Sequence, residues 1–507
     1  MSRKKKKGCN PLGTILILGG IFLVALVGSL FAGKLVIQNW IQGDGLQSVI
    51  QKKAESHLKA QVNIDDVQWN RKSAFVGKLT ARGYEEAAFS KLNLDALRAN
   101  IGIKDSAFDV SEISVSRVYG EFSNDRLQGK AAEPETIAVP EKSNLPGWLK
   151  GYIPQRTVIG EVEIGSATLE VKDDTGKTSM AIRETRASIQ PDLNTGVVKI
   201  EANGGKIELA EPAPPINIRE SSLRFQNPNL FINNASLEVY DGGHIAGLGE
   251  VSFGEVSTVD LDLKVSGIDI KKVVNDEWKG KVSGTVRGPV KVNGTTDHLV
   301  QKGTLHLENG VLEAIPILDK IGKYTKSKRF SRLVLNQAQA DFVLDGEVLE
   351  LRNIQLESDG LTRVEGVLDK EGEAISGVLQ VGVTPGTLRW IPGAEKDVFT
   401  ESRDGFVWTT MKLGGTIDQI SEDLSARLMS AAAMDIVDKL PANLQNTLKG
   451  IIGGGTEVTP TDPASPADGK AVDPADQVKD LILDKVGDEV GDQGKKLLEG
   501  LGTLFGQ

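Results

Sequence analysis

The chain has 507 residues, a formal net charge of −10 and one cysteine, Cys9. An acidic net charge disfavours nucleic-acid binding, and the export inferred below disfavours it more strongly, so no nucleic-acid partner is expected. A single cysteine excludes an internal disulfide, so apolar packing alone must hold the folded part together, and the chain is long enough for that.

The N-terminus has a basic tip followed by a long apolar run. Residues 1–11 contain Arg3 and the run Lys4–Lys7, and residues 12–33 contain no charged side chain. An apolar helix of this length spans a hydrocarbon core of about 30 Å, and the basic tip is expected to stay in the cytoplasm. The alternative is a cleaved signal peptide ending near Phe31-Ala32-Gly33, but the run is longer than such a segment normally is. We therefore predict a transmembrane anchor over residues 12–33, with the rest of the chain exported.

Residues 34–129 are predicted to form the first β region. It begins with a short amphipathic helix, because apolar residues recur at helical spacing from Leu46 to Leu58. From Val62 the apolar residues alternate with polar ones, which indicates strands exposed on one face. Residues 130–147 are rich in Glu, Ala and Pro and poor in large apolar residues, so they are predicted to be a linker or long loop.

Residues 148–420 continue the alternation and are predicted to form the main β region. Asp174-Thr175-Gly176 predicts a turn, and Asn203-Gly204-Gly205, between two short apolar strands, predicts a hairpin. A helix with Pro316 in its first turn is predicted at residues 315–321.

The C-terminal part changes to helical spacing. Residues 421–452 predict a helical segment, residues 453–475 a disordered Gly/Pro/Thr/Asp linker, and residues 476–507 an amphipathic helix. The last helix could pack on the β region or dock to a partner. The predicted fold class is mainly β: a transmembrane helix, an elongated, twisted antiparallel β-groove with a few short helices, and amphipathic helices at the C-terminus.

No catalytic or metal-binding pattern is recognisable. The four histidines, at positions 57, 244, 298 and 306, do not occur at metal-ligand spacings, and neither a nucleophile elbow nor a phosphate-binding loop is present. Most carboxylates occupy polar positions of alternating strands, where a solvated face explains them. We expect no catalytic residues, no metal and no cofactor, so a hydrolase is the weakest of the functional hypotheses.

The strands have an architectural implication. If they join in one twisted sheet, their apolar faces form a lengthwise trough, which is either filled as a core or open to an apolar ligand. Alternation places Leu261, Leu263 and Val265 on one face, and we expect Leu305 and Leu307 to share it. The side chains expected to line the trough are Leu261, Leu263, Val265, Leu305, Leu307, Phe342, Leu344, Leu349 and Leu351.

The order of these segments resembles the AsmA-like proteins of the diderm bacterial envelope. The resemblance covers the anchor to about Leu428 and is carried by the segments Val62–Trp69, Gly77–Gly83, Gly303–Leu312, Phe342–Gly346, Leu349–Leu351 and Gly366–Asp369. It implies a repeating β-groove that moves phospholipid between membranes without catalytic residues. The chain is shorter than the largest members of the family, so its groove is expected to need a partner or an oligomer, or to act locally.

Two functional hypotheses follow. The first is a non-enzymatic, single-pass inner-membrane protein whose periplasmic β-groove binds and passes phospholipid and contributes to outer-membrane lipid homeostasis. The second is a structural or regulatory envelope assembly protein with a closed β core, whose C-terminal helices recruit another envelope protein. An open trough distinguishes the first from the second.

Overall fold

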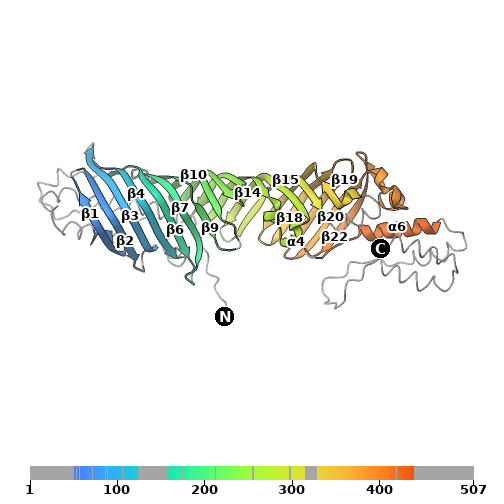
Figure 1. Ribbon diagram of the computed structural model, residues 1–507, viewed down its shortest axis with the longest axis horizontal. Helices are drawn as coiled ribbons and strands as arrows, with labels where there is room; N and C mark the ends of the chain where they lie inside the picture. Colours follow the sequence, from blue (N-terminus) through green and yellow to red (C-terminus); the bar gives the residue numbers. More distant parts are fainter. Residues whose placement is uncertain are drawn as a thin grey trace. The chain divides into compact units, whose positions relative to one another are not determined.

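The computed structural model describes residues 51–123, 157–313 and 328–438, except residues 53, 56–57, 71, 86, 88, 105–106, 174, 212, 254–255, 296–297 and 418. Over these residues the chain is mainly β, as predicted, and its strands belong to one large mixed sheet (Figure 1). The segments predicted at residues 1–11, 12–33, 130–147, 315–321, 453–475 and 476–507 lie outside the described residues. Among the residues that are described, no helix is both long enough and apolar enough to span a bilayer.

The strands are β1 (Ala60–Trp69), β2 (Ser73–Gly83), β3 (Phe89–Lys104), β4 (Ala107–Ser123), β5 (Thr157–Ile159), β6 (Val162–Lys172), β7 (Thr178–Asp192), β8 (Val197–Asn203), β9 (Lys206–Leu209), β10 (Ile216–Gln226), β11 (Asn229–Val239), β12 (Gly243–Ser252), β13 (Thr258–Asp269), β14 (Val282–Thr295), β15 (His298–Glu313), β16 (Arg332–Val334), β17 (Gln337–Asp345), β18 (Val348–Ser358), β19 (Thr362–Glu371), β20 (Ala374–Val383), β21 (Glu401–Arg403), β22 (Phe406–Gly415) and β23 (Ile420–Glu422). The helices are η2 (Ile270–Lys272), α4 (Asp276–Lys279), η3 (Lys328–Ser331), η4 (Pro385–Trp390), the π-helix η5 (Ala394–Val398) and α6 (Leu424–Asp438).

The chain divides into two compact units. Unit 1 comprises residues up to Ile268 together with Arg287–Gly303, and unit 2 comprises Asp269–Val286 together with residues from Thr304 onward. The division falls inside the region predicted as one stretch, residues 148–420, rather than at the predicted linker.

The prediction of a purely antiparallel sheet is wrong. Most neighbouring strands are antiparallel, but β4 pairs in parallel with β5 and β6, so that Ile113 lies opposite Val162. Antiparallel neighbours can be joined by tight turns, whereas parallel neighbours need a long crossover. The connection between Ser123 and Thr157 is long enough to return the chain to the start of β4, and the resulting sheet is mixed.

The predicted hairpin at Asn203-Gly204-Gly205 is also wrong, although the turn at Thr175 and Gly176 is present between β6 and β7. Strands β8 and β9 do not pair with each other; both pair with β7 on one side and β10 on the other. Gly204 and Gly205 have φ values of 70° and 80°. A Cβ on Gly205 would lie 2.3 Å from the carbonyl oxygen of Arg183. The chain therefore keeps the same direction through the two glycines, which only interrupt the strand between β8 and β9.

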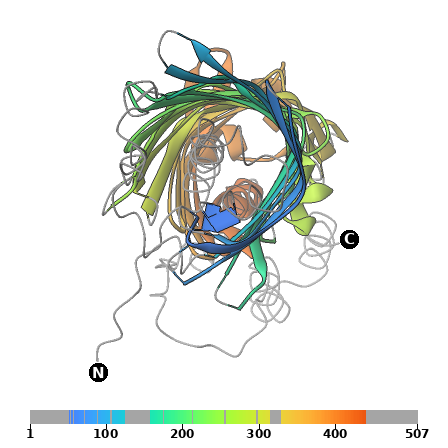
Figure 2. The ribbon, with the colours of Figure 1, turned by 90° about the vertical axis from the view of Figure 1, so that its left-hand side faces the viewer.

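Left-handed residues recur in the middle of strands. Non-glycine residues with φ between 49° and 56° lie inside β1, β3, β4, β7, β15 and β18, at Asp66, Ala96, Glu112, Glu184, Asn309 and Asn353. In β3 the buried positions are Leu92 and Leu94 before Ala96, and Leu97 after it. The left-handed residue shifts the alternation by one position, so the same face of the sheet stays apolar. Such bulges bend a strand and increase its twist. The blue strands of unit 1 are correspondingly curved in Figure 2.

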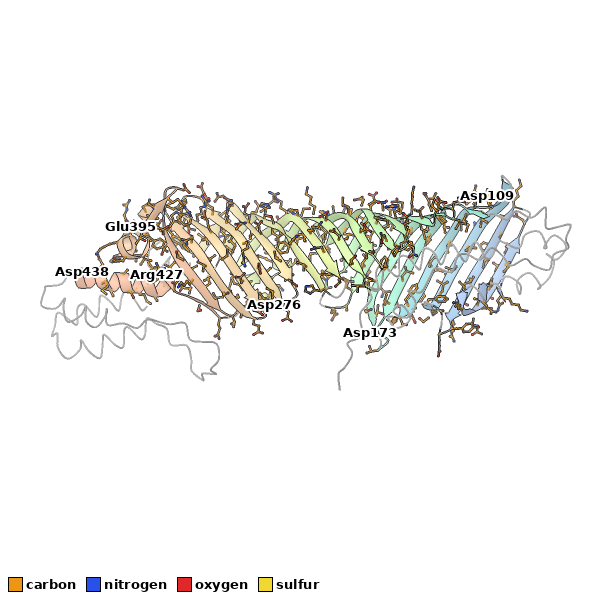
Figure 3. The ribbon with its side chains drawn as sticks, turned by 180° about the vertical axis from the view of Figure 1, so that it is seen from behind. Asp109, Asp173, Asp276, Glu395, Arg427 and Asp438 are labelled. Carbon is orange, nitrogen blue, oxygen red and sulfur yellow. The ribbon has the colours of Figure 1, made fainter. Side chains whose placement is uncertain are left out.

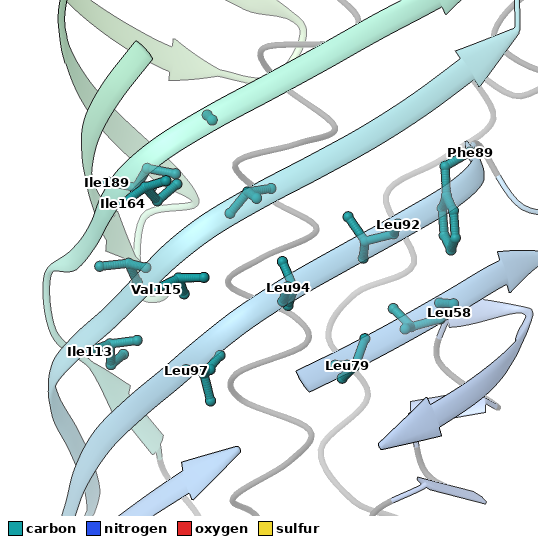
Figure 4. Packing of buried hydrophobic residues seen from close by; sticks show 14 of the residues in the cluster. Leu58, Leu79, Phe89, Leu92, Leu94, Leu97, Ile113, Val115, Ile164 and Ile189 are labelled. Carbon is teal, nitrogen blue, oxygen red and sulfur yellow. The ribbon is translucent and has the colours of Figure 1, made fainter. Parts of the chain in front are cut away.

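The core of unit 1 lies on one face of its strands. Apolar side chains from β1 to β13 form a buried cluster there, and Figure 4 shows those of the first strands projecting to the same side. Ala54 and Leu58, from the helical residues that precede β1, belong to this cluster. Glu55, on the same helical stretch, accepts a hydrogen bond at 3.4 Å from the backbone N–H of Val62 in β1.

Candidate functional site

In unit 2 the two faces of the sheet are distinguished by a polar contact between β15 and β17. The hydroxyl of Thr304 donates to Asp341 at 2.6 Å, so these two side chains share one face, which we call the polar face. Side chains alternate along a strand, so Leu305 and Phe342 point to the opposite, apolar face. His306 lies on the polar face with Thr304, two residues along the same strand.

The strand register brings the predicted groove residues of unit 2 together. Phe342 lies opposite Leu351, and Leu351 lies opposite Leu368 of β19, which makes one apolar row across three strands. Leu344 and Leu349 form the next row. Leu305 and Leu307 of β15, which pairs with β17, lie on the same face. The six predicted residues of unit 2 are thus on one face, and the register adds Leu368, which sequence reasoning did not include.

These rows are incompletely buried. Phe342, Leu344, Leu349 and Leu351 are each half-buried and lie outside the buried cluster of the unit, whereas Leu307 packs against that cluster. Full burial of a leucine side chain is worth about 1.5–3 kcal/mol relative to exposure, so part of this stabilisation is not realised in these rows. A surface with this property can accept further apolar contact.

The other end of the same apolar face is closed. Val381 and Val383 of β20 and Met411 of β22 are buried together with residues of η4, η5 and α6. From α6, Leu424 and Leu428 belong to this cluster. The apolar face of unit 2 therefore combines a filled core at one end with half-buried rows at the other.

In unit 1 the predicted residues Leu261, Leu263 and Val265 lie on β13. The ammonium of Lys291 lies 2.9 Å from Asp260 and 3.5 Å from Asp262, which fixes these carboxylates on the polar face. The three apolar residues therefore occupy the other face, where all are half-buried. Val265 lies opposite Ile245, which in turn lies opposite Leu237, in a row across three strands. Whether these residues share a face with Leu305 and Leu307 of unit 2 stays a prediction.

Leucines on the apolar face repeatedly lie against glycines of a neighbouring strand. Leu263 lies opposite Gly247, where an added Cβ would be 2.4 Å from Leu263 Cδ2, and Leu261 lies opposite Gly249 in the same way. In unit 2, Leu379 lies opposite Gly366. The absence of a Cβ lets the leucine lie flat on the neighbouring strand. Glycines opposite leucines are visible in the sequence only after the register is known, so this feature was missed.

Charged side chains on the polar faces are paired across strands. Hydrogen bonds from Thr304 and Asn353 lower the pKa of Asp341 in unit 2, and Arg352 contacts both Glu350 and Asp369. Within the three described stretches, no group of three or more His, Cys, Asp or Glu side chains could hold a metal ion. The expectation that the chain has no metal, no cofactor and no catalytic residues stays a prediction.

Comparison of the sequence with models of known protein families and with curated proteins found no match.

Proposed function

We propose that the chain is a membrane-anchored, non-enzymatic periplasmic protein that binds phospholipid on the apolar faces of its β-sheet and passes it along an apolar β-groove. The half-buried rows beside Leu351 carry this proposal. An acyl chain laid over them would remove both surfaces from water, at about 0.8 kcal/mol for each buried CH₂ group. The resemblance to AsmA-like proteins supports the same reading and gives the proposed location in the inner membrane, with a role in outer-membrane lipid homeostasis.

The second candidate is a structural or regulatory envelope assembly protein with a filled core. The closed end of the apolar face, where η4, η5 and α6 pack on β20 and β22, favours it. In this case the half-buried rows would be covered by protein rather than by lipid, and the C-terminal helices would recruit another envelope protein.

The two candidates are separated by photo-crosslinking from within the apolar face. The full chain is made in a diderm bacterial host with benzoylphenylalanine at position 351, irradiated in cells and analysed by mass spectrometry for phospholipid adducts. The matched control is position 343 on the paired strand, because Val343 is also half-buried but faces the polar side opposite Glu350.

Adducts at position 351 and not at position 343 are the expected result. Equal labelling of both positions, or labelling of neither, would overturn the proposal. Protein adducts at position 351 without lipid adducts would favour the assembly protein.

A further inference from the structure

An insertion between β13 and β14 leaves apolar side chains of unit 2 incompletely buried. Residues Asp269–Lys281 replace a tight turn with η2 and α4, and neither helix contains a buried residue. The insertion nevertheless includes the large apolar residues Ile270, Val273, Val274 and Trp278. Val273 is 57% exposed, which is unusual for a valine. The apolar residues of this insertion therefore lack the burial that a protein core provides.

The conformation of the insertion is held by its own hydrogen bonds. The side chain of Asp269 accepts from the backbone N–H of Lys271 at 3.0 Å, and that of Asn275 accepts from the N–H of Trp278 at 3.2 Å. The Lys281 ammonium lies 5.3 Å from the centre of the Trp278 ring. Capped turns therefore hold the exposed Val273 and the half-buried Trp278 in place. Figure 3 shows Asp276, on α4, at the lower margin of the strands.

The insertion adjoins a second basic segment of the same unit. The N–H of Glu313 donates to the carbonyl of Lys281 at 2.8 Å, and Arg332 pairs with the Glu313 carboxylate at 2.5 Å. Val334, two residues beyond Arg332, is 53% exposed. We call the insertion, the segment Lys328–Val334 and Glu313 together the basic rim. Its basic residues are Lys271, Lys272, Lys279, Lys281, Lys328, Arg329 and Arg332, and its acidic residues are Asp269, Asp276, Glu277 and Glu313.

We propose that the basic rim binds the surface of an anionic bilayer. Trp278 and Val273 enter the headgroup region, while the lysines contact lipid phosphates. Tryptophan favours the boundary between water and hydrocarbon, and a lysine stem lies along apolar surface while its ammonium reaches the headgroups. The chain has a net charge of −10, but the rim has an excess of positive charge. This local excess is complementary to an anionic surface. This inference goes beyond lipid binding on the apolar faces and does not depend on it.

The test uses a fluorescent probe on the rim. Because Cys9 is the only cysteine, a Cys9→Ser background allows single labelling of Val273→Cys with an environment-sensitive fluorophore. The full chain is held in phosphatidylcholine nanodiscs and mixed with vesicles of equal parts phosphatidylglycerol and phosphatidylcholine that contain a lipid-borne quencher. The matched control is Val378→Cys, because Val378 is 44% exposed and lies on β20 of the same unit, which is not part of the rim.

We expect a blue shift and quenching at position 273 and neither at position 378. Replacing both Lys271 and Lys272 by glutamine should weaken vesicle binding about thirtyfold, since each basic residue near an anionic surface contributes about 1 kcal/mol and about 1.4 kcal/mol corresponds to tenfold. Vesicles of phosphatidylcholine alone should quench far less. No quenching at position 273, or equal quenching at both positions, overturns the proposal. The lipid adducts at position 351 are measured separately, so either proposal can fail alone.

Discussion

At the scale of single residues, the closest backbone approaches occur at glycines. Gly366 has φ +155°, and an added Cβ would lie 2.3 Å from the carbonyl oxygen of Val378 and 2.9 Å from the Cα of Leu379. Both atoms belong to the paired strand and cannot move without breaking the register. A side chain at this position therefore has to displace the neighbouring strand.

Gly366→Ala is expected to lower the free energy of unfolding by about 1–3 kcal/mol, the usual range for overpacking. The comparison is Gly102→Ala on β3, where an added Cβ meets nothing within 4 Å. Denaturant unfolding of the two variants and the parent chain measures the difference. Equal losses for both variants would contradict the argument from close approach.

Titratable residues of unit 1 form a cross-strand cluster on the polar face. Arg183 contacts Glu170 at 2.8 Å and Glu208 at 2.5 Å. Burial acts to raise the pKa of Glu170, but hydrogen bonds from Arg183 and Lys172 outweigh it and lower that pKa. Burial, together with the nearby charges of Glu170 and Glu121, raises the pKa of Tyr119 to about 12. The carboxylates are thus held charged and the phenol neutral.

A pH dependence of stability follows from these carboxylates. A pKa that is lowered in the fold adds stability that is fully present above the ordinary value of 4.5 and is lost as the pH falls below it. Arg183→Met should therefore destabilise unit 1 by about 1–2 kcal/mol near neutral pH, and the difference from the parent chain should shrink in acid. Urea unfolding at several pH values measures this difference in stability.

The control is Arg219→Met, which removes a more exposed pair with Glu238 and should cost less stability. A penalty for Arg183→Met that is constant with pH would contradict the assignment.

At the scale of elements, α6 closes one end of the apolar face of unit 2. Leu424 and Leu428 enter the buried cluster, and the Arg427 guanidinium donates to the hydroxyl of Thr409 on β22 at 2.7 Å. The N–H of Lys412, also on β22, donates to Asp423 just before the helix at 2.8 Å. Apolar packing and polar contacts therefore both hold α6 on the strands.

Leu428→Ala is expected to destabilise unit 2 by about 2–5 kcal/mol, because it removes a buried side chain and leaves a cavity. Ser430→Ala, on the exposed side of the same helix, should change stability by less than about 0.5 kcal/mol. Thermal unfolding of both variants checks this. A small effect of Leu428→Ala would show that α6 is not part of the core.

A substitution on β13 tests the predicted apolar face of unit 1. Leu263→Asp places a charge over Gly247, where apolar contact is expected, and should cost several kcal/mol or abolish lipid capture. The control is Lys264→Asp at the next, exposed position of the strand. Stability and lipid recovered by mass spectrometry are measured together. If Leu263→Asp leaves both unchanged, the face has been assigned wrongly.

The sequence predicted the strands well, because alternation at residues such as Leu261 and Leu263 reflects burial on one face directly. Part of the helical segment predicted over residues 421–452 is present as α6 (Leu424–Asp438), and residues 439–452 lie outside the described residues. The parallel pairing of β4 with β6 was not predictable in this way, because alternation contains no information about strand direction. Gly204-Gly205 has the composition of a hairpin turn, and only the pairing of β8 and β9 with the same neighbours shows that the chain continues. Which part of the apolar face of unit 2 is closed and which part is half-buried depends on where η4, η5 and α6 pack, and alternation along the strands does not predict this.

At the scale of the whole molecule, the β units and the segment beyond residue 452 are expected to be separable. The described residues end at Asp438 of α6, and within them the buried cluster of unit 2 already joins α6 to η4, η5 and the strands. If the last helix docks to a partner and does not pack on the β region, a chain ending at Ile452 should unfold at nearly the temperature of the full chain, yet impair function in cells. Calorimetry and an assay of outer-membrane permeability test the two halves of this prediction. A large fall in the unfolding temperature would place residues 453–507 in the core.

The hydrogen bond between Glu55 and the N–H of Val62 has a consequence for self-association. Among the described strands, β1 is paired on one side only, with β2. An open strand edge is a template for addition of another chain and hence for aggregation. Glu55 occupies one of the donors on that edge, and the exposed charges of Asp65 and Asp66 on β1 oppose the approach of an identical strand. These features protect the edge of β1 against the addition of a strand from another copy of the chain.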